Sequence, residues 1–158
     1  MIFISVQEQD FDVGEDYRQL QKAGSEVNST EIGGIAIFTG QVRDLADRPL
    51  KYLRLEHYPG MTEKSLQQTA ERAAERWPVI DIRVIHRIGD LSPSEQIVLV
   101  GVSSAHRDAA FAACEFMMDI LKTSAPFWKK EQYVDGNSGW VDAKDVDQQR
   151  AERWQSGD

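Results

Sequence analysis

The run Gln96-Ile-Val-Leu-Val-Gly-Val102 is the feature that most constrains the fold of this chain. Apolar residues fill it without the polar alternation that marks a strand with one face in water. The run therefore predicts a central strand that is covered on both faces. The segments around it must supply that cover, and their order indicates the architecture.

Alternating or β-branched segments predict further strands, and apolar residues spaced three and four apart predict helices. Strands are expected at Ile2–Val6, about 34–42, Leu50–Tyr58 and Ile80–Val84, and helices at about 13–23, about 62–77 and through 110–121 up to Pro126. The charged segment Arg43–Pro49 is expected to be a hairpin loop. This order predicts an α+β fold with helices packed on a mostly antiparallel sheet. We expect one domain over residues 1–158, with an acidic C-terminal segment at about 135–158.

The net charge of −8 arises at the two ends of the chain. Residues 1–32 carry 2 basic and 7 acidic groups, residues 131–158 carry 3 and 7, and the middle carries 13 and 12. This distribution argues against a duplex nucleic-acid-binding protein, which normally presents a basic face. No apolar run approaches the ~20 residues of a membrane helix, and the N-terminus lacks the pattern of a signal peptide. We therefore expect a cytoplasmic protein without a membrane segment.

Several conspicuous residues favour structural roles. The lone cysteine, Cys114, excludes an intramolecular disulfide, and its place on the apolar face of the last helix favours a core residue over a nucleophile. The three histidines lack the spacing of a metal site, so no metal is expected. In the acidic tail, Trp140 and Trp154 suggest docking against another surface, such as a partner chain.

The first candidate for chemistry is the pair His106 and Arg107, which follows the central strand. Ser104 suits an N-cap, so both side chains fall in the first helical turn, where the helix dipole disfavours cations. A bound anion that meets the helix N-terminus and both cations would explain this placement. Side chains that simply reach solvent or Asp108 explain it equally well.

The second candidate is the segment from Lys122 to Glu131, which contains Lys129 and Lys130. Adjacent residues of a strand face opposite sides, so one lysine of the pair should point inward or along a groove. A partly desolvated lysine beside other cations becomes a usable base or nucleophile. Without other evidence, a solvated lysine pair is the more common explanation.

A weaker candidate is the strand end Gln41-Val42-Arg43. An arginine there can bind a phosphate with two parallel hydrogen bonds, although an arginine is also common in ordinary turns.

Helix geometry adds a constraint on the two stronger candidates. His106 and Lys122 lie 16 residues apart on one helix, which corresponds to ~24 Å. One small ligand cannot touch both within a chain. The spacing therefore motivates a homodimer in which His106 of one chain meets Lys122 of the other.

Six segments together resemble the family of large, catalytic subunits of molybdopterin synthase. They are Phe-Thr-Gly-Gln-Val-Arg (38–43), Leu-Glu-His-Tyr-Pro-Gly-Met (55–61), Val-Ile-His-Arg-Ile-Gly (84–89), Gly-Val-Ser-Ser-Ala-His-Arg (101–107), Leu-Lys-Thr (121–123) and Ala-Pro-Phe-Trp-Lys-Lys-Glu (125–131). The resemblance implies a hammerhead-type α/β fold and an enzyme without a cofactor. It implies conversion of cyclic pyranopterin monophosphate to molybdopterin, a sulfur transfer in molybdenum cofactor biosynthesis.

The resemblance also implies partners. Sulfur would arrive as a thiocarboxylate on the C-terminal Gly-Gly of a small ubiquitin-like subunit. Two large subunits would form a homodimer, with one small subunit at each outer end of a heterotetramer. The alternative interpretation is a non-catalytic anion-binding or regulatory α+β module that uses the same basic residues as a receptor.

Residue roles follow from the resemblance position by position. Lys122 and Lys129 would be catalytic, and the substrate-binding set would be Gln41, Val42, Arg43, His106, Arg107, Lys122, Lys129, Lys130, Glu131 and Lys144. Lys144, which follows Trp-Val-x-Ala, would act from the neighbouring chain. Many relatives have lysine at the position of Gln41 and arginine at that of Lys144, and a lysine lacks the bidentate fork of arginine.

Overall fold

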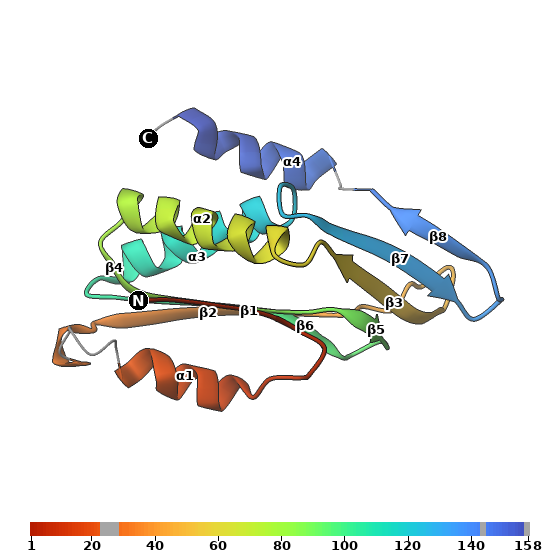
Figure 1. Cartoon of the computed structure of the whole chain (residues 1–158), viewed down its shortest axis with the longest axis horizontal. Helices are drawn as coiled ribbons and strands as arrows, with labels where there is room; N and C mark the ends of the chain where they lie inside the picture. The colour runs from red at the N-terminus through yellow and green to blue at the C-terminus, as the bar shows by residue number, and fades with distance from the viewer. Residues whose placement is uncertain (23–28, 143–144, 157–158) are drawn as a thin grey trace.

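Two four-stranded sheets form the framework of the chain (Figure 1). The computed structural model describes residues 1–22, 29–142 and 145–156. The first sheet has the order β1 (Ile2–Gln7), β4 (Val79–Arg87), β6 (Gln96–Ser104), β2 (Gly34–Gln41). The second has the order β5 (Gly89–Leu91), β3 (Leu50–His57), β7 (Phe127–Tyr133), β8 (Ser138–Val141). Only β1 and β4 pair in parallel, so the predicted α+β class with mostly antiparallel strands is confirmed.

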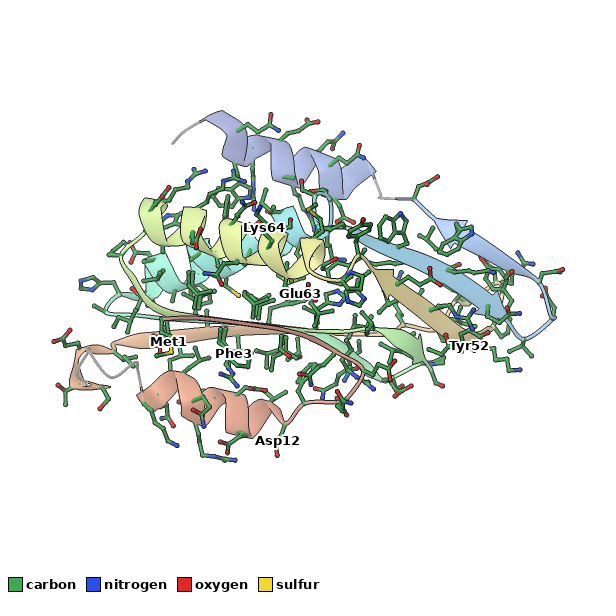
Figure 2. All side chains as sticks on the ribbon, viewed as in Figure 1. Met1, Phe3, Asp12, Tyr52, Glu63 and Lys64 are labelled. Atoms are coloured by element: carbon green, nitrogen blue, oxygen red, sulfur yellow. The ribbon has the colours of Figure 1, made fainter. Side chains whose placement is uncertain are left out.

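Helices cover the first sheet on both faces (Figure 1). On one side lie α2 (Met61–Arg76) and α3 (Arg107–Leu121), and on the other lies α1 (Val13–Lys22). β6 thus has the two-sided cover that its apolar run predicts, and every residue from Val98 to Ser104 is buried. Side chains fill the space between the helices and the sheet (Figure 2).

Helix α1 approaches β6 closely because the strand contains a glycine. Leu20 is 1% exposed, and a Cβ at Gly101 would lie 2.5 Å from its Cδ1 atom. An ion pair adds a second connection, since Arg83 Nε on β4 lies 2.7 Å from Oδ1 of the buried Asp16. Any side chain at residue 101 would therefore force the Leu20 side chain to move.

The acidic C-terminal segment is folded onto its own chain. After β8 it forms α4 (Asp145–Glu152) and a 3-10 helix (Arg153–Ser156), which lie over α2 and α3 (Figure 1). The Trp154 ring packs edge-on at 5.5 Å from Trp77 and 5.6 Å from Phe116. Its Nε1 donates to Asp119 Oδ2 at 2.8 Å. For Trp154, the docking surface expected from the sequence is thus within the chain itself, whereas Trp140 is 58% exposed.

Some predicted boundaries and pairings differ from the structure. The hairpin expected at Arg43–Pro49 is wrong, because β2 and β3 belong to different sheets and each pairs with a distant strand. β4 extends to Arg87 rather than ending near Val84, and β5, β8 and α4 were not anticipated. A short 3-10 turn (Ser29–Glu31) precedes β2, and the predicted end of the first helix at about residue 23 falls outside the described residues. In the described part of the chain, no helix is both long and apolar enough to cross a membrane.

Candidate active site

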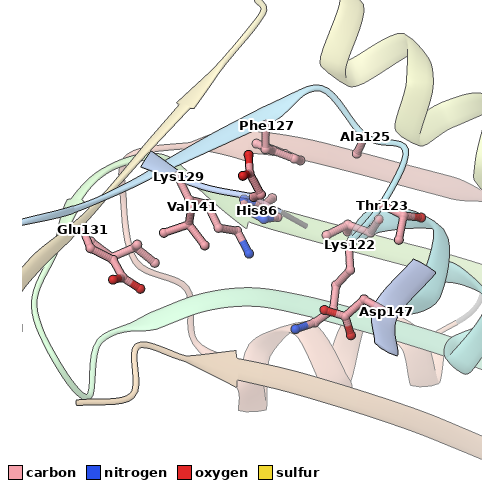
Figure 3. A pocket seen from close by; sticks show the side chains of 12 residues that line it. His86, Lys122, Thr123, Ala125, Phe127, Lys129, Glu131, Val141 and Asp147 are labelled. Carbon is pink, nitrogen blue, oxygen red and sulfur yellow. The ribbon is translucent and has the colours of Figure 1, made fainter. Parts of the chain in front are cut away.

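A cavity of about 240 Å³ opens where the end of α3 meets the second sheet (Figure 3). Side chains from β3, β4, α3, β7, β8 and α4 contribute to it. The lining residues are Leu53, His86, Leu121, Lys122, Thr123, Ala125, Phe127, Lys129, Glu131, Val141, Asp142 and Asp147. The chain thus brings both predicted catalytic lysines, Lys122 and Lys129, to one hollow.

The two lysines reach the cavity from different elements. Lys122 is the C-cap of α3, which ends before Pro126 as predicted. Lys129 lies on β7 with Phe127 and Glu131 on the same face, because strand side chains alternate. Lys130 consequently faces the opposite side, where its Nζ lies 5.6 Å from the ring centroid of Trp140. The expectation that one lysine of the pair points inward is met by Lys129.

Carboxylates balance the lysines in this cavity. Glu131, Asp142 and Asp147 all line it, and Figure 3 shows Asp147 on the same side as Lys122. Glu131 also accepts a hydrogen bond from the Tyr133 hydroxyl at 2.6 Å, which raises the pKa of that tyrosine. The ammonium groups of the two lysines can donate hydrogen bonds to these carboxylates. The cavity is therefore suited to holding a proton donor in place.

Neutral His86 forms part of the cavity wall. The residue is 2% exposed, and its ring stacks on Phe127 at a centroid distance of 3.8 Å. Burial lowers the pKa of His86 to about 3, with the charge of Lys129 acting in the same direction. Since the ring stays uncharged at neutral pH, it adds a hydrogen-bonding group to the site without adding a charge.

His106 and Arg107 lie at the other end of α3. The helix begins at Arg107 with His106 as its N-cap, so the expected N-cap at Ser104 is wrong by two residues. Ser104 is the last residue of β6, and its Oγ instead donates to the Pro78 carbonyl oxygen at 3.0 Å. Both basic side chains are exposed, and neither lines the cavity that holds Lys122.

A close backbone contact fixes the turn that carries these two residues. Gly33 donates its N–H to Ser104 O at 2.9 Å, and a Cβ at Gly33 would lie 2.0 Å from the Ala105 carbonyl oxygen. No side chain fits at that distance. The absence of one at residue 33 therefore allows the turn before Arg107 to pack directly on the start of β2.

The candidates at the end of β2 lie apart from both the lysine cavity and the start of α3. Gln41 and Arg43 are exposed, whereas the side chain of Val42 is 4% exposed in a small core with Leu50, Leu55 and Leu91. The N–H of Val42 donates to Glu95 O, and its carbonyl accepts from Ser94 N. Lys144, the remaining predicted residue, lies outside the residues that the structure describes.

A second hollow lies along the middle of α3 and beside β2, the edge strand of the first sheet. This apolar groove has a volume of about 540 Å³ and is lined by Ala36, Ile37, Phe38, Phe111, Cys114, Glu115, Met118, Asp119, Lys122 and Arg150. Phe111 is 66% exposed and Phe38 43%. Lys122 lines both hollows, so the groove and the cavity meet at this residue.

Cys114 does not look like a sulfur carrier. Its side chain is 7% exposed, and burial raises the pKa of its thiol to about 11. Only the thiolate is an effective nucleophile, so this cysteine stays in its inert form at neutral pH. The sequence-based assignment of Cys114 to the core is confirmed.

Sequence reasoning missed three groups of the cavity: His86, Asp142 and Asp147. His86 looks like an ordinary strand residue, because its proximity to Lys129 depends on two sheets meeting. The aspartates belong to the acidic tail, which the sequence presents as a solvated segment. The tryptophans Trp140 and Trp154 in that tail were the available signal, because they suggested that the segment packs against another surface together with its aspartates.

Comparison with known proteins identifies the family of this chain. The family model described as MoaE protein matches residues 6–124. A molybdopterin synthase catalytic subunit from Vibrio cholerae is 54% identical over 154 residues, which cover 96% of this chain and 97% of the relative. The subunit of the same name from Escherichia coli K12 is 50% identical over 153 residues, with 96% and 97% covered.

Solved structures give the same assignment. The MoaE protein from Burkholderia ambifaria superposes with a TM-score of 0.81 at 46% identity, covering 98% of this chain and 99% of that one. Molybdopterin synthase from Staphylococcus aureus superposes with a TM-score of 0.76 at 34% identity, covering 87% and 96%. The chain therefore belongs to the MoaE family, the family of molybdopterin synthase catalytic subunits.

Proposed function

We propose that this chain converts cyclic pyranopterin monophosphate to molybdopterin, using sulfur from the thiocarboxylated C-terminus of a small ubiquitin-like subunit. One observation carries the proposal: the cavity holds Lys122 and Lys129 together while the only cysteine is buried and protonated. The chain has amines to guide an acyl transfer but no accessible thiol to supply sulfur. A partner must therefore bring the sulfur atom.

The proposed substrate site is shared between two copies of the chain. His106 and Lys122 cap opposite ends of the same helix, so the two halves of the predicted anion site are separate within one chain. A twofold axis through the middle of α3 would place His106 and Arg107 of one copy beside Lys122 of the other. The exposed Phe111 and Phe38 of the apolar groove lie where such an axis would pass, and they would be buried.

In this dimer the basic residues divide their tasks. Arg43, His106 and Arg107, all exposed, would bind the phosphate and the pterin, with Lys144 and Gln41 as further contacts. Val42 would act by anchoring the strand end from which Arg43 projects. Lys130, on the outer face of β7, would stay outside the cavity and act at its rim.

The cavity would receive the thiocarboxylate. A carbonyl attacked at this group develops negative charge on oxygen, and the ammonium groups of Lys122 and Lys129 stabilise that charge. Either lysine then serves as acid and base, or as a transient nucleophile. Glu131 would orient Lys129 by accepting a hydrogen bond from its ammonium group. A fold relative from Helicobacter pylori was solved as a complex of subunits 1 and 2 of molybdopterin-converting factor, a precedent for a two-subunit assembly in that protein.

A single-turnover assay tests the proposal. The wild-type chain, mixed with thiocarboxylated small subunit and cyclic pyranopterin monophosphate, should yield a dithiolene product. Lys122→Ala and Lys129→Ala should each slow the reaction by at least about a hundredfold, in line with the loss of a general acid–base group. Lys64→Ala, an exposed lysine on α2, is the matched control. If both cavity variants keep the wild-type rate, the assignment is wrong.

The alternative is a non-catalytic anion-binding or regulatory module. It predicts that cyclic pyranopterin monophosphate binds but that no dithiolene forms with the thiocarboxylated partner. A single-strand RNA-binding protein would require stacking aromatics on an exposed basic sheet, and the net charge of −8 argues against this function.

We also propose that residues 1–158 act as one catalytic domain in the cytoplasm. Fractionation of cells that express the tagged chain tests this location.

A further inference from the structure

His86 and Lys129 meet inside the cavity although they come from different sheets. The imidazole of His86 stacks on Phe127 with 20° between the ring planes. Phe127 and Lys129 are two residues apart on β7, so their side chains leave the same face of the strand. A ring stacked on Phe127 therefore lies beside the stem of Lys129, and Figure 3 shows His86 next to both.

A hydrogen bond determines which ring nitrogen of His86 carries the proton. Nδ1 lies 2.8 Å from the carbonyl oxygen of Arg87, an atom that only accepts, so Nδ1 is the donor. The neutral ring then leaves a lone pair on Nε2. Because the pKa of His86 is lowered to about 3 by burial, that lone pair is present throughout the neutral range.

The Nε2 atom opens onto the cavity. The hydrogen bond to the Arg87 carbonyl occupies Nδ1, and among the described residues no buried side-chain nitrogen or oxygen is without a partner. His86 lines the cavity, and its Nδ1 atom is turned to the Arg87 backbone, so we infer that Nε2 lies on the cavity side of the ring. A lone acceptor thus faces the space into which Lys129 also extends.

We propose, on the basis of the function argued above, that Nε2 of His86 accepts a hydrogen bond from the amino group of Lys129 and positions this lysine for sulfur transfer. A lysine ammonium has three donors and no acceptor, so one of its N–H groups can be donated to a neutral nitrogen while the others bind elsewhere. The carboxylates of Glu131, Asp142 and Asp147 line the same cavity and compete for these protons. A neutral acceptor holds the amine in place without cancelling its charge, which a carboxylate would do.

Two substitutions of His86 separate positioning from packing. In His86→Gln the side-chain amide reaches the place of Nε2, and in His86→Asn it reaches the place of Nδ1. Both lose the stacking on Phe127, so their folding should suffer alike. We expect the single-turnover rate at saturating substrate to stay within about threefold of wild type in the glutamine variant and to fall at least about tenfold in the asparagine variant.

A spectroscopic measurement tests the contact without any catalysis. With ¹⁵N-labelled histidine, the Nε2 resonance of His86 should move when Lys129 is replaced by methionine. It should stay in place in Lys64→Met, a surface substitution on α2. This arm uses the full chain alone, and so it remains decisive even if the wild-type enzyme forms no dithiolene and the proposed function fails.

An Nε2 resonance that does not shift in Lys129→Met overturns the inference, whatever rates the single-turnover assay gives. Given an active wild-type enzyme, equal rates in the glutamine and asparagine variants overturn it as well, because packing alone would then explain His86. Rescue by glutamine together with a resonance shift specific to Lys129→Met supports it.

Discussion

His106 and Lys122 are the N-cap and the C-cap of the same helix, α3, which has 15 residues between them. At 1.5 Å per residue their backbones are ~24 Å apart, several times the length of a hydrogen bond. The helix between them presents its exposed Phe111 to the apolar groove. The two ends of α3 can serve one ligand only if a second copy of the chain packs antiparallel along this helix.

Mixed dimers test this arrangement. Chains with His106→Ala and Arg107→Ala should be inactive, and so should chains with Lys122→Ala. After the two are mixed and allowed to exchange, half of the dimers contain one of each, and one of their two sites is intact. Activity should return to about a quarter of the wild-type value. Dithiolene yield in the single-turnover assay measures it.

The control for subunit complementation places all the substitutions in one chain. A chain with His106→Ala, Arg107→Ala and Lys122→Ala, mixed with wild type, leaves no new site to be created by exchange. Its mixture should show only the activity of the wild-type sites that remain. Absence of recovery in the first mixture, with exchange verified by mass, would rule out the shared site.

Gly33 is predicted to be essential for the turn that carries His106 and Arg107. In Gly33→Ala the new Cβ would lie 2.0 Å from the Ala105 carbonyl oxygen, so the backbone must shift. Overpacking of this kind destabilises a protein by about 1–3 kcal/mol. Urea unfolding should show this loss, and the affinity for cyclic pyranopterin monophosphate should fall because the turn is displaced.

The matched control is Gly139→Ala on β8, where an added Cβ meets no atom within 4 Å. This variant should stay within about 0.5 kcal/mol of the wild-type stability. If Gly33→Ala proved as stable as Gly139→Ala, the close packing of the turn on β2 would be contradicted.

Local patterns predicted most of the elements, although not β5, β8 and α4, and they did not predict how distant elements meet. The alternation of Lys129 and Lys130 follows from the period of a strand, and the sequence therefore predicts that one points inward. The separation of His106 from Lys122 follows from the rise of a helix in the same way. By contrast, pairing of β3 with β7 rather than with β2 depends on contacts far apart in the sequence, which no local pattern encodes. The places of His86 and Asp147 in the cavity depend on the same contacts.

The Trp154 side chain is predicted to hold the C-terminal segment over the site. Its ring packs against Trp77 and Phe116, and its Nε1 donates to Asp119, three residues before Lys122. Trp154→Ala should cost about 2–3 kcal/mol, less than for a fully buried ring because Trp154 is partly exposed. It should also slow turnover, since α4 carries Asp147 into the cavity.

Trp140→Ala serves as the comparison for Trp154→Ala, because Trp140 is 58% exposed and contacts Lys130 at the surface of β7. The loss of an exposed cation–π contact is about 0.5–1 kcal/mol. The midpoints of urea unfolding show which of the two variants loses more stability. A Trp154→Ala variant as stable as Trp140→Ala would contradict the packing of the tail on α2 and α3.

The buried His86 predicts a specific loss of stability in acid. Its pKa is about 3 in the folded chain and near 6.5 when unfolded, so the unfolded state binds more protons between these values. Stability from this group is therefore complete above pH 6.5 and declines as the pH falls toward 3. Between pH 7 and pH 4 the wild-type chain should lose about 3 kcal/mol more than His86→Gln, whose side chain does not titrate. Urea unfolding at a series of pH values measures the difference, in which all the shared carboxylates cancel. Parallel curves for the two proteins, or an NMR titration of His86 with a midpoint near 6.5, would show that the ring is solvated and that it does not form the wall of the lysine cavity.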